Sequence, residues 1–429
     1  MIAIVGGGIS GLATALELER LGADFIVLEA TERVGGVIRS AEVDGRVLDW
    51  GPQRTRLTPG IKALIGGLDL EDRLVTAPPD LDLYVFRGDR LYAVPFSVPS
   101  FLTSDIVSWQ GKARLLLEPF TGPADPEERV AEYFGRKVGP ELYEVLVAPL
   151  YGGLYGSDPA DMRVGLSLIH VLRQLGVRRS LLLPLLRRGG RVSPPPACSF
   201  EDGMRELPEA MARALGERLR LGAPVRSLRR DGAGWCVECD DEVVAAEAVV
   251  ICTPASATSH LLRSAAPVAA DAVGRLRYNP LAVVHLDAET ELRGMGFQVA
   301  FTEPDLALRG VTFNDSLFGR RNLYTAYLGG ARHPEVEGMG EEDLGRLATR
   351  EFLACTGYDA SVLSVALEHM PAWDVTWASI EGLEFPPGLH VATNWWSRPG
   401  LPGRLSEAAS VARALVSGSS PRAQPRAVA

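Results

Sequence analysis

Residues 2–11 read IAIVGGGISG, and this stretch decides the fold. Its first four residues form a short apolar run, which is typical of a parallel strand that is buried on both faces. Apolar side chains then recur at helical spacing over 9–21. The glycines match the G-x-G-x-x-G pattern between the predicted strand and the predicted helix. The sequence therefore predicts a strand, a glycine-rich turn and a helix as the first unit of an α/β domain.

The three patterned glycines have separate physical roles in such a turn. Gly6 permits a tight reversal, Gly8 lets the backbone approach a pyrophosphate, and Gly11 lets the helix pack closely on the strand. The first helical residues, Ile9 and Ser10, present backbone N–H groups that favour phosphate. We therefore expect a dinucleotide-binding turn, and the alternative is a set of glycines in an ordinary turn.

The segment after the second predicted strand, 25–28, adds a specific signal. This strand ends in Glu29, which lies 18 residues after the last patterned glycine, and a carboxylate there accepts hydrogen bonds from ribose hydroxyls. Arg33 can neutralise a phosphate, and the pair Gly35-Gly36 lets backbone lie against the cofactor. Dehydrogenases that bind NAD alone lack this extension. The pattern therefore favours a different dinucleotide.

Residues 29–36, EATERVGG, and 49–52, DWGP, resemble the FAD signature of the large flavoprotein superfamily of amine oxidases, carotenoid desaturases and porphyrinogen oxidases. In this superfamily the adenine end also meets a later strand, here 223–226, and the flavin end meets a turn after 389–394. The resemblance implies FAD contacts from Gly6, Gly8, Ile9, Ser10, Gly11, Glu29, Ala30, Arg33, Gly35, Gly36, Gly51, Pro52, Gln53, Val225, Asn394 and Leu401.

The predicted architecture is α/β: a Rossmann-type FAD-binding domain with a discontinuous substrate-binding α+β domain and a helical insertion. We expect FAD-binding pieces at 1–80, 196–265 and 376–416, a substrate-binding helical insertion at 81–195, a substrate-binding sheet at 266–375 and a disordered tail at 417–429. Local patterns predict a helix that Asp125 caps and Pro126 begins, a hairpin over 234–253 whose second arm is 248–252, and a helix over 405–416.

The middle of the chain resembles the oxygen-dependent protoporphyrinogen and coproporphyrinogen oxidases in the segments 134–139, 148–159 and 199–208. The resemblance implies oxidation of a porphyrinogen, protoporphyrinogen IX or coproporphyrinogen III, to the porphyrin in haem synthesis, with O₂ as acceptor and H₂O₂ released. It also implies that either Arg54 or Arg56 pairs with a substrate propionate and that Gly153 lines the substrate cavity through its backbone. The flavin carries the chemistry, so no catalytic side chain is assigned.

Two alternatives stay open. Residues 399–403, PGLPG, are similar to those of carotenoid desaturases, and Gly403-Arg404 replaces the acid that porphyrinogen oxidases usually carry there. A polyene desaturase is therefore the first alternative, and a flavin-binding protein without turnover is the second. Many amine oxidases are similar in having a lysine near flavin N5 in the second half of the chain, and no lysine follows Lys137 here. Amine oxidation is therefore disfavoured.

Composition excludes several further classes. The chain has 429 residues and a net charge of −10, which argues against a nucleic-acid binder. Five scattered cysteines, the absence of a signal-peptide pattern and the lack of a long apolar run favour a cytoplasmic protein. Cys236 and Cys239 alternate faces on a predicted strand, and no zinc spacing is present, so no metal is expected.

One basic segment stands out in this acidic chain. Residues 163–191 hold seven arginines and no acid, with apolar residues between them: Arg163, Arg173, Arg178, Arg179, Arg187, Arg188 and Arg191. The segment is typical of a solvated helical face, of a peripheral contact with the anionic cytoplasmic membrane surface, or of an attractor for an anionic tetrapyrrole.

Overall fold

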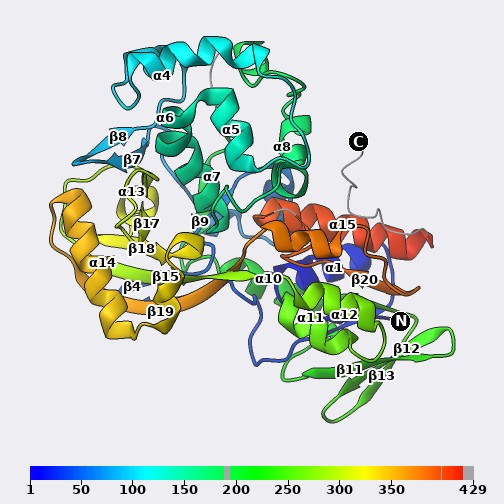
Figure 1. Ribbon diagram of the computed structural model, residues 1–429. Coiled ribbons are helices and arrows are strands. Elements are labelled where there is room, and N and C mark those ends of the chain that lie inside the picture. The colour runs from blue at the N-terminus through cyan, green and yellow to red at the C-terminus, as the bar shows by residue number, and fades with distance from the viewer. Residues whose placement is uncertain (188–193, 398, 419–429) are drawn as a thin grey trace. The chain divides into compact units, whose positions relative to one another are not determined.

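A computed structural model describes residues 1–187, 194–397 and 399–418, which divide into two compact units (Figure 1). Unit 1 combines Met1–Thr76, Ala197–Leu276 and the chain from Thr376 on, and unit 2 combines Ala77–Pro196 with Arg277–Val375. The chain thus returns to unit 1 twice. The assignment of cofactor and substrate roles to the predicted pieces stays a prediction.

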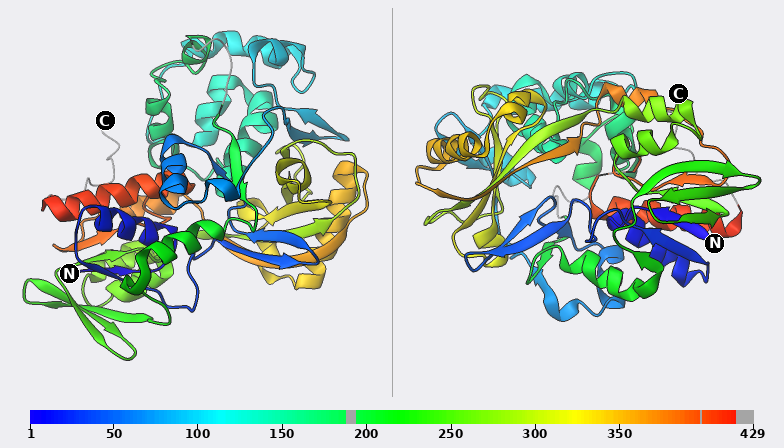
Figure 2. Two further views of the ribbon diagram at one scale, coloured as in Figure 1. Left: turned by 180° about the vertical axis from the view of Figure 1, so that it is seen from behind. Right: turned by 90° about the horizontal axis from the view of Figure 1, so that it is seen from below.

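Unit 1 is built on a five-stranded parallel sheet. Its strands, in order across the sheet, are β10 (Leu219–Arg220), β2 (Phe25–Leu28), β1 (Ile2–Val5), β14 (Ala248–Ile251) and β20 (Leu389–Val391). Helix α1 (Ile9–Arg20) directly follows the central strand β1. It lies alongside α15 (Leu401–Ser417), as the blue and red helices of Figures 1 and 2 show. The predicted strand–turn–helix unit is therefore present.

The predicted hairpin over 234–253 is partly wrong. Strand β12 (Gly234–Cys239) pairs with β13 (Val243–Ala246) and with β11 (Val225–Asp231). The expected second arm is instead β14, which pairs in parallel with β1 from Ala248 opposite Ile2 to Ile251 opposite Val5. All four residues of β14 are buried, whereas burial alternates along β13. Burial on both faces suits a central parallel strand better than a hairpin arm.

Unit 1 contains further strands and α-helices outside this sheet. They are β3 (Arg39–Val43), β4 (Arg46–Trp50), β5 (Thr55–Arg56), α2 (Pro59–Gly67), β6 (Leu74–Thr76), β9 (Ala197–Phe200), α10 (Glu206–Leu215), α11 (Ala255–Leu262) and α12 (Pro267–Gly274). The core of the unit includes Leu12, Val27, Leu207 and Val411, which are contributed by α1, β2, α10 and α15. Helix α15 begins four residues before the predicted helix because Pro402 fits its first turn.

Unit 2 contains a seven-stranded sheet. Its order is β19 (Ser361–Pro371), β15 (Tyr278–Asp287), β18 (Leu323–Gly329), β17 (Leu308–Phe313), β16 (Gly296–Val299), β7 (Leu83–Arg87) and β8 (Arg90–Ala93). Helix α14 (Glu341–Thr356) packs on this sheet, and Phe352 from it contacts Tyr324 with ring centroids 5.6 Å apart. Segments far apart in sequence therefore share one apolar core.

Unit 2 also holds most of the helices. They are α3 (Val98–Thr103), α4 (Trp109–Arg114), η2 (Leu115–Phe120), α5 (Val130–Val138), α6 (Pro140–Leu142), η3 (Tyr143–Val147), α7 (Ala148–Tyr155), η4 (Val164–Leu168), α8 (Ile169–Gln174), α9 (Leu182–Arg187), α13 (Asn314–Phe318), η6 (Gly330–Arg332) and η7 (Pro334–Gly338). Most of these helices fall within the predicted helical insertion.

The predicted start of α5 is wrong by several residues. The helix begins at Val130 rather than at Pro126. Asp125 instead accepts the Glu127 N–H at 2.9 Å, and the Pro126 carbonyl accepts the Gly165 N–H at 2.8 Å. The segment before the helix is therefore held in a non-helical pairing with residues 163–165, which local capping signals could not reveal.

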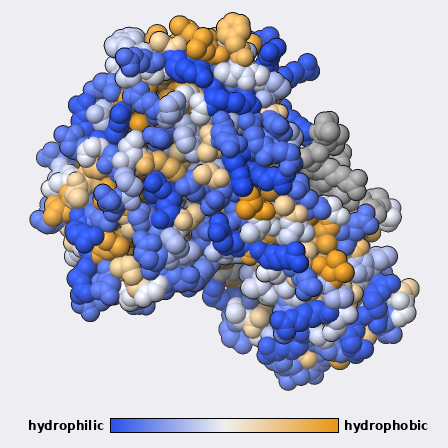
Figure 3. Space-filling view, viewed as in Figure 1, coloured by the Kyte–Doolittle hydropathy of each residue, from blue (hydrophilic) through white to orange (hydrophobic). Residues whose placement is uncertain are grey.

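Large apolar side chains are exposed around α4. They are Leu102, Trp109, Leu116, Leu117 and Phe120, and orange atoms gather in this region at the top of Figure 3.

Among the helices that the structure describes, none is both long enough and apolar enough to span a bilayer. The predicted disordered tail at 417–429 is wrong at its start, because Ser417 is the last residue of α15. Residues 419–429 lie outside the described part of the chain, and so do Arg188 and Arg191 of the seven arginines.

Candidate functional site

The glycine-rich turn after β1 leaves the start of α1 without a side-chain cap. Gly8 is the N-cap residue and makes no capping side-chain bond, and the first turn of α1 carries no acidic residue. The backbone N–H groups of Ile9, Ser10 and Gly11 precede the first intrahelical bond, which Leu12 donates to Gly8. Together with the helix dipole, these groups favour an anion at this end of α1.

Glu29 is held toward this turn by hydrogen bonds. Its Oε2 accepts the Gly7 N–H at 2.6 Å, and its Oε1 accepts the backbone N–H and the hydroxyl of Thr31 at 2.9 and 2.8 Å. The carboxylate is therefore oriented by the protein itself. Oε2 accepts one hydrogen bond and keeps a second lone pair, so the group can still accept a hydrogen bond from a ribose hydroxyl.

Residues 33–36 lie beside the glycine turn. The Gly35 N–H donates to the Gly7 carbonyl at 3.0 Å, and a Cβ on Gly36 would come within 3.4 Å of the Gly8 Cα. Arg33 donates to the Gly36 carbonyl at 2.9 Å and is exposed. The two glycine segments thus form one cradle of bare backbone beside an acid and a cation. This cradle fits the pyrophosphate and ribose of a dinucleotide.

The strand predicted to meet the adenine end reaches the same place. The Ala223 N–H donates to the Glu29 carbonyl at 2.8 Å, and the Gly222 N–H donates to the Thr31 carbonyl at 3.0 Å. Val225 begins β11 two residues later. Exposed Ala30 lies between the two bonded carbonyls in sequence. The structure therefore brings both predicted segments together at the carboxyl edge of β2.

Residues 49–53 are tied to another part of the predicted signature. Asp49 is buried, and its Oδ1 accepts the Ser40 hydroxyl at 2.5 Å and the Met204 N–H at 2.9 Å. The buried side chain of Gln53 donates to the Asp49 carbonyl at 3.3 Å. Asp49 therefore anchors the segment that contains Gly51 and Pro52. It also links this segment to residues 199–208, which the sequence motifs indicated separately.

The C-terminal turn is organised by Arg404, a residue that sequence reasoning did not select for a role. Its buried guanidinium donates to the carbonyls of Thr393 and Ser397 at 2.8 Å and of Asn394 at 3.1 Å. Leu401 is the first residue of the helix α15 that carries it. An arginine in place of the expected acid therefore stabilises the turn from within. The sequence signal that could have indicated this role is a single arginine among the apolar residues that begin α15.

The turn also offers one unpartnered polar atom. The Thr393 hydroxyl oxygen is buried and has no hydrogen-bond partner among the described residues. Its neighbour Asn394 stands at the place where the resemblance puts the flavin end. The residues present in unit 1 are thus compatible with FAD, from the bare cradle at β1 to this turn.

The three predicted substrate residues lie in different units. Arg54 and Arg56 belong to unit 1, where Arg56 forms part of β5 and burial lowers the pKa of its guanidinium. Gly153 belongs to unit 2 and lies inside α7. Its φ is not in the positive range, so the backbone conformation does not require a glycine at this position. A Cβ there would come within 2.5 Å of Gln298 Oε1.

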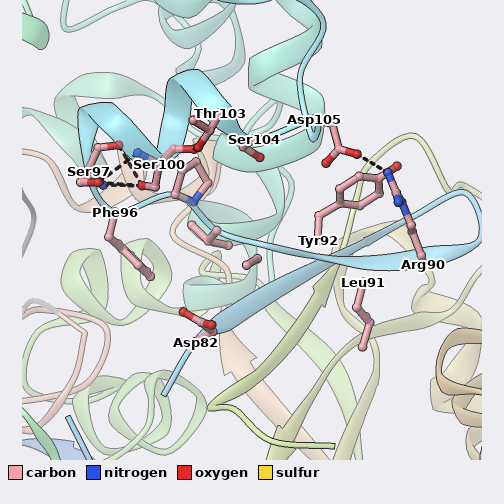
Figure 4. Close-up of a pocket in the computed structure, with 13 residues that line it drawn as sticks. Asp82, Arg90, Leu91, Tyr92, Phe96, Ser97, Ser100, Thr103, Ser104 and Asp105 are labelled. Atoms are coloured by element: carbon pink, nitrogen blue, oxygen red, sulfur yellow. Dashed lines mark hydrogen bonds and ion pairs between the residues drawn. The ribbon is translucent and has the colours of Figure 1, made fainter. Parts of the chain in front are cut away.

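A pocket of about 690 Å³ lies in unit 2 beside β8 and α3 (Figure 4). Its polar groups largely pair with one another. Ser97 and Ser100 form the capping box of α3, and Arg90 pairs with Asp105 while stacking on the Tyr92 ring at 4.4 Å. None of the predicted site residues lines this pocket, and we assign it no ligand.

We expect Glu29→Ala to weaken FAD binding by about 1–3 kcal/mol, because it removes charge-assisted hydrogen bonds. The dissociation constant of the apoprotein for FAD, followed by flavin fluorescence quenching, measures the effect. Glu32→Ala is the matched control, since Glu32 is an exposed acid three residues away. Equal affinities of the two variants would show that the Glu29 carboxylate does not contact the cofactor.

Comparison with known families and proteins relates most of the chain to flavoproteins. The model of the family described as flavin containing amine oxidoreductase matches residues 9–401. Protoporphyrinogen oxidase 1, chloroplastic, of Spinacia oleracea is 28% identical over 393 residues, with 81% of this chain and 69% of that protein covered. Protoporphyrinogen oxidase of Homo sapiens is 26% identical over 415 residues, with 86% and 85% covered.

Solved structures share the fold. A crystal structure of a protein from Exiguobacterium sp. 255-15 has a TM-score of 0.77 at 20% identity, with 97% of this chain and 99% of that chain covered. Cyclohexylamine oxidase from Brevibacterium oxydans IH-35A has a TM-score of 0.65 at 17% identity, with the same coverage. The predicted fold, a Rossmann-type domain with a discontinuous second domain, is confirmed.

Proposed function

The chain belongs to the flavin containing amine oxidoreductase family, and from this membership we propose that it oxidises a porphyrinogen to the porphyrin. Its cofactor is FAD, as in the family. The observation that carries the substrate proposal is the similarity to protoporphyrinogen oxidases over more than four fifths of the chain. O₂ is the proposed acceptor, and the substrate is protoporphyrinogen IX or coproporphyrinogen III in haem synthesis.

Unit 1 supplies the proposed cofactor site. The first turn of α1 would hold the pyrophosphate, and Glu29 would hold the adenosine ribose. The turn that Arg404 stabilises would meet the flavin. The chemistry that FAD would supply when bound is hydride acceptance from the substrate and transfer of the electrons to O₂. A porphyrinogen carries six more hydrogens than the porphyrin, so each porphyrin formed requires three O₂ and releases three H₂O₂.

The substrate contacts remain proposals. Either Arg54 or Arg56 would pair with a propionate, and a surface ion pair is the competing role for each. Gly153 is exposed on α7 and would face the macrocycle through its backbone. No lysine follows Lys137 in the sequence, which continues to disfavour amine oxidation.

A substrate comparison tests the proposal. FAD-loaded protein is incubated in air with protoporphyrinogen IX, coproporphyrinogen III or phytoene, and porphyrin fluorescence, polyene absorbance and H₂O₂ are followed. We expect porphyrin formation with three H₂O₂ per porphyrin, and no porphyrin above the uncatalysed rate without O₂. Polyene formation without porphyrin would establish the desaturase alternative. If none of the three substrates reduces the flavin, a non-catalytic flavin protein is favoured.

The same assay addresses the two arginines. Arg54→Ala or Arg56→Ala should lower kcat/KM by about tenfold or more, because a charge-assisted pair contributes about 1.5–3 kcal/mol. Lysine is an imperfect replacement, since it lacks the planar fork. If both alanine variants keep the wild-type kcat/KM, propionate recognition lies elsewhere.

We further propose a cytoplasmic protein that contacts an anionic membrane surface through 163–191. In the described part of this segment, exposed Arg173, Arg178, Arg179 and Arg187 alternate with exposed Val171, Leu175, Leu183 and Leu186. Arg163 does not contribute, because it pairs with Glu127. Sedimentation with phosphatidylglycerol vesicles but not with phosphatidylcholine vesicles is the expected result, and equal sedimentation with both would exclude an electrostatic contact.

A further inference from the structure

Arg309 lies at a break in the strand register between β17 and β18 in the sheet of unit 2. Leu308 pairs with Leu328, yet Gly310 pairs with Tyr327, so the register shifts across Arg309. A bulge of this kind turns a side chain away from the ordinary alternation, and bulges are frequent beside binding sites. The Arg309 side chain is nevertheless only 9% exposed. A cation has thus been placed inside the unit.

A second guanidinium stacks on the same aromatic ring. Arg309 Cζ lies 4.9 Å from the centroid of the Phe301 ring, and Arg332 Cζ lies 4.3 Å from it. Arg332 also donates to the Phe301 carbonyl at 3.4 Å. Cation–π contacts attract the face of each guanidinium to the ring, and they do not involve the N–H donors in the guanidinium plane. The pair is therefore a concentrated positive site.

The two arginines have one ion-paired carboxylate between them among the described residues. Asp158 lies 3.9 Å from Arg332 Nε, and in the described residues it is the one carboxylate that forms an ion pair with either arginine. Arg309 Nη1 is buried and has no hydrogen-bond partner among the described residues. Burial and the charge of Arg332 lower the pKa of Arg309 to about 10, and the charge of Asp158 opposes this shift, so Arg309 stays charged at neutral pH.

A buried cation with an N–H group that has no acceptor, such as Nη1 of Arg309, is costly, and proteins usually pair such a group. Arg309 therefore indicates a missing anionic partner. A planar guanidinium matches a carboxylate with two parallel N–H donors, so Arg309 can bind a carboxylate, and the nearby charge of Arg332 favours the same anion.

The cluster adjoins the segment that the family resemblance assigns to substrate. A Cβ on Gly152 would come within 3.2 Å of the Phe301 ring, so helix α7 packs directly on this ring. The Gln298 amide lies between Gly153 and Gly310, because a Cβ on either glycine would come within 2.9 Å of it or closer. The arginine pair and Gly153 thus belong to one continuous surface of unit 2.

We propose that Arg309 and Arg332 form a carboxylate site that binds one propionate of the tetrapyrrole. This inference rests on the proposed function, and it adds a recognition site independent of Arg54 and Arg56. The carboxylate would complete the hydrogen bonding of Arg309 and offset the second positive charge. Esterification of the substrate should therefore remove the interaction without changing the size of the macrocycle core.

The test compares mesoporphyrin IX with its dimethyl ester, which are not turned over, in one detergent buffer. Dissociation constants for FAD-loaded full-length protein are obtained from fluorescence quenching. We expect wild type to bind the acid about tenfold or more tightly than the ester, as a charged hydrogen bond implies. Arg309→Met should lower this preference several-fold, and any preference that persists would reflect the second propionate and Arg54 or Arg56. The variant should keep its FAD content and thermal stability, since the substitution also removes a buried charge.

Arg320→Met is the matched control. Arg320 is 8% exposed and stacks on Phe318 at 5.6 Å, yet it belongs to a different cluster of unit 2. This variant should keep the wild-type preference for the acid. An unchanged preference in Arg309→Met overturns the proposal. If that variant does not fold, Arg332→Met replaces it, because Arg332 is more exposed, and an unchanged preference in Arg332→Met overturns the proposal equally.

Failure of this inference is distinguishable from failure of the proposed function. Porphyrinogen turnover by wild type together with an arginine-independent acid preference refutes the carboxylate site and leaves the function. An Arg309-dependent preference for the acid without turnover of any porphyrinogen refutes the function and leaves the carboxylate site.

Discussion

Gly11→Ala is expected to reduce FAD occupancy of the purified protein to less than about a tenth of wild type, because its clash exceeds the ordinary overpacking cost of roughly 1–3 kcal/mol. A Cβ at residue 11 would lie 1.9 Å from the carbonyl oxygen of Gly6. The obstacle is backbone, so no side-chain rotation relieves it. The turn after β1 must open, and the N–H groups at the start of α1 then lose the arrangement that favours a pyrophosphate.

The ratio of flavin absorbance to protein absorbance measures the effect, with circular dichroism as a check on folding. Gly60→Ala is the control, since Gly60 is exposed in the first turn of α2 and a Cβ there would meet no atom within 4 Å. The control should retain wild-type FAD. Full occupancy in Gly11→Ala would contradict the close approach on which the cofactor site depends.

Lys137→Met is expected to lower the free energy of unfolding by about 3–5 kcal/mol, because it leaves a buried carboxylate without its cation. Lys137 and Glu118 are both 0% exposed, with Nζ and Oε1 3.3 Å apart. Lys137 also donates to the carbonyls of Gly122 and Arg179, the former at 2.6 Å. Burial lowers the pKa of Lys137, and the Glu118 charge opposes this shift.

Glu118 in turn accepts the Ser180 hydroxyl at 2.5 Å and the Leu181 N–H at 2.8 Å. The ion pair therefore joins η2, α5 and the segment before α9. Thermal and urea unfolding with helical circular dichroism measure the loss. Lys62→Met is the control, since Lys62 is exposed and should change stability by less than about 0.5 kcal/mol.

A double variant separates charge from packing. Glu118→Gln combined with Lys137→Met removes both charges, so it should be more stable than Lys137→Met alone. If the single lysine variant unfolds like wild type, the pair is not buried in solution. The expected result would give Lys137 a structural role in the helical part of unit 2.

Local sequence was sufficient for the cofactor cradle. The strand at 2–5, the glycine turn and the helix that follows are contiguous, and their hydrophobic period and turn chemistry act within about 20 residues. Glu29 belongs to the same unit, so its position relative to Gly7 followed from the length of one βα unit. The structure places these residues together as predicted, and the contacts with FAD itself stay a prediction.

Only tertiary structure decided the features that depend on distant partners. The sequence of β14 is also compatible with a hairpin arm, yet the strand joins the parallel sheet because β1, about 246 residues earlier, offers a largely buried neighbour. Arg404 departs from the family pattern, and its bonds to Thr393 and Ser397 explain how the turn tolerates it. In both cases the deciding contact joins residues whose proximity no local period or motif encodes.

The arginine pair of unit 2 shows the same division. The sequence determined that Arg309 lies in an apolar stretch, but the register shift that turns its side chain toward Phe301 arises from pairing between β17 and β18. Turn chemistry and amphipathic period are properties of a short segment, so sequence alone determined the cradle at β1. Register, burial and charge pairing are properties of segments packed together, so tertiary structure alone decided where the buried charges lie.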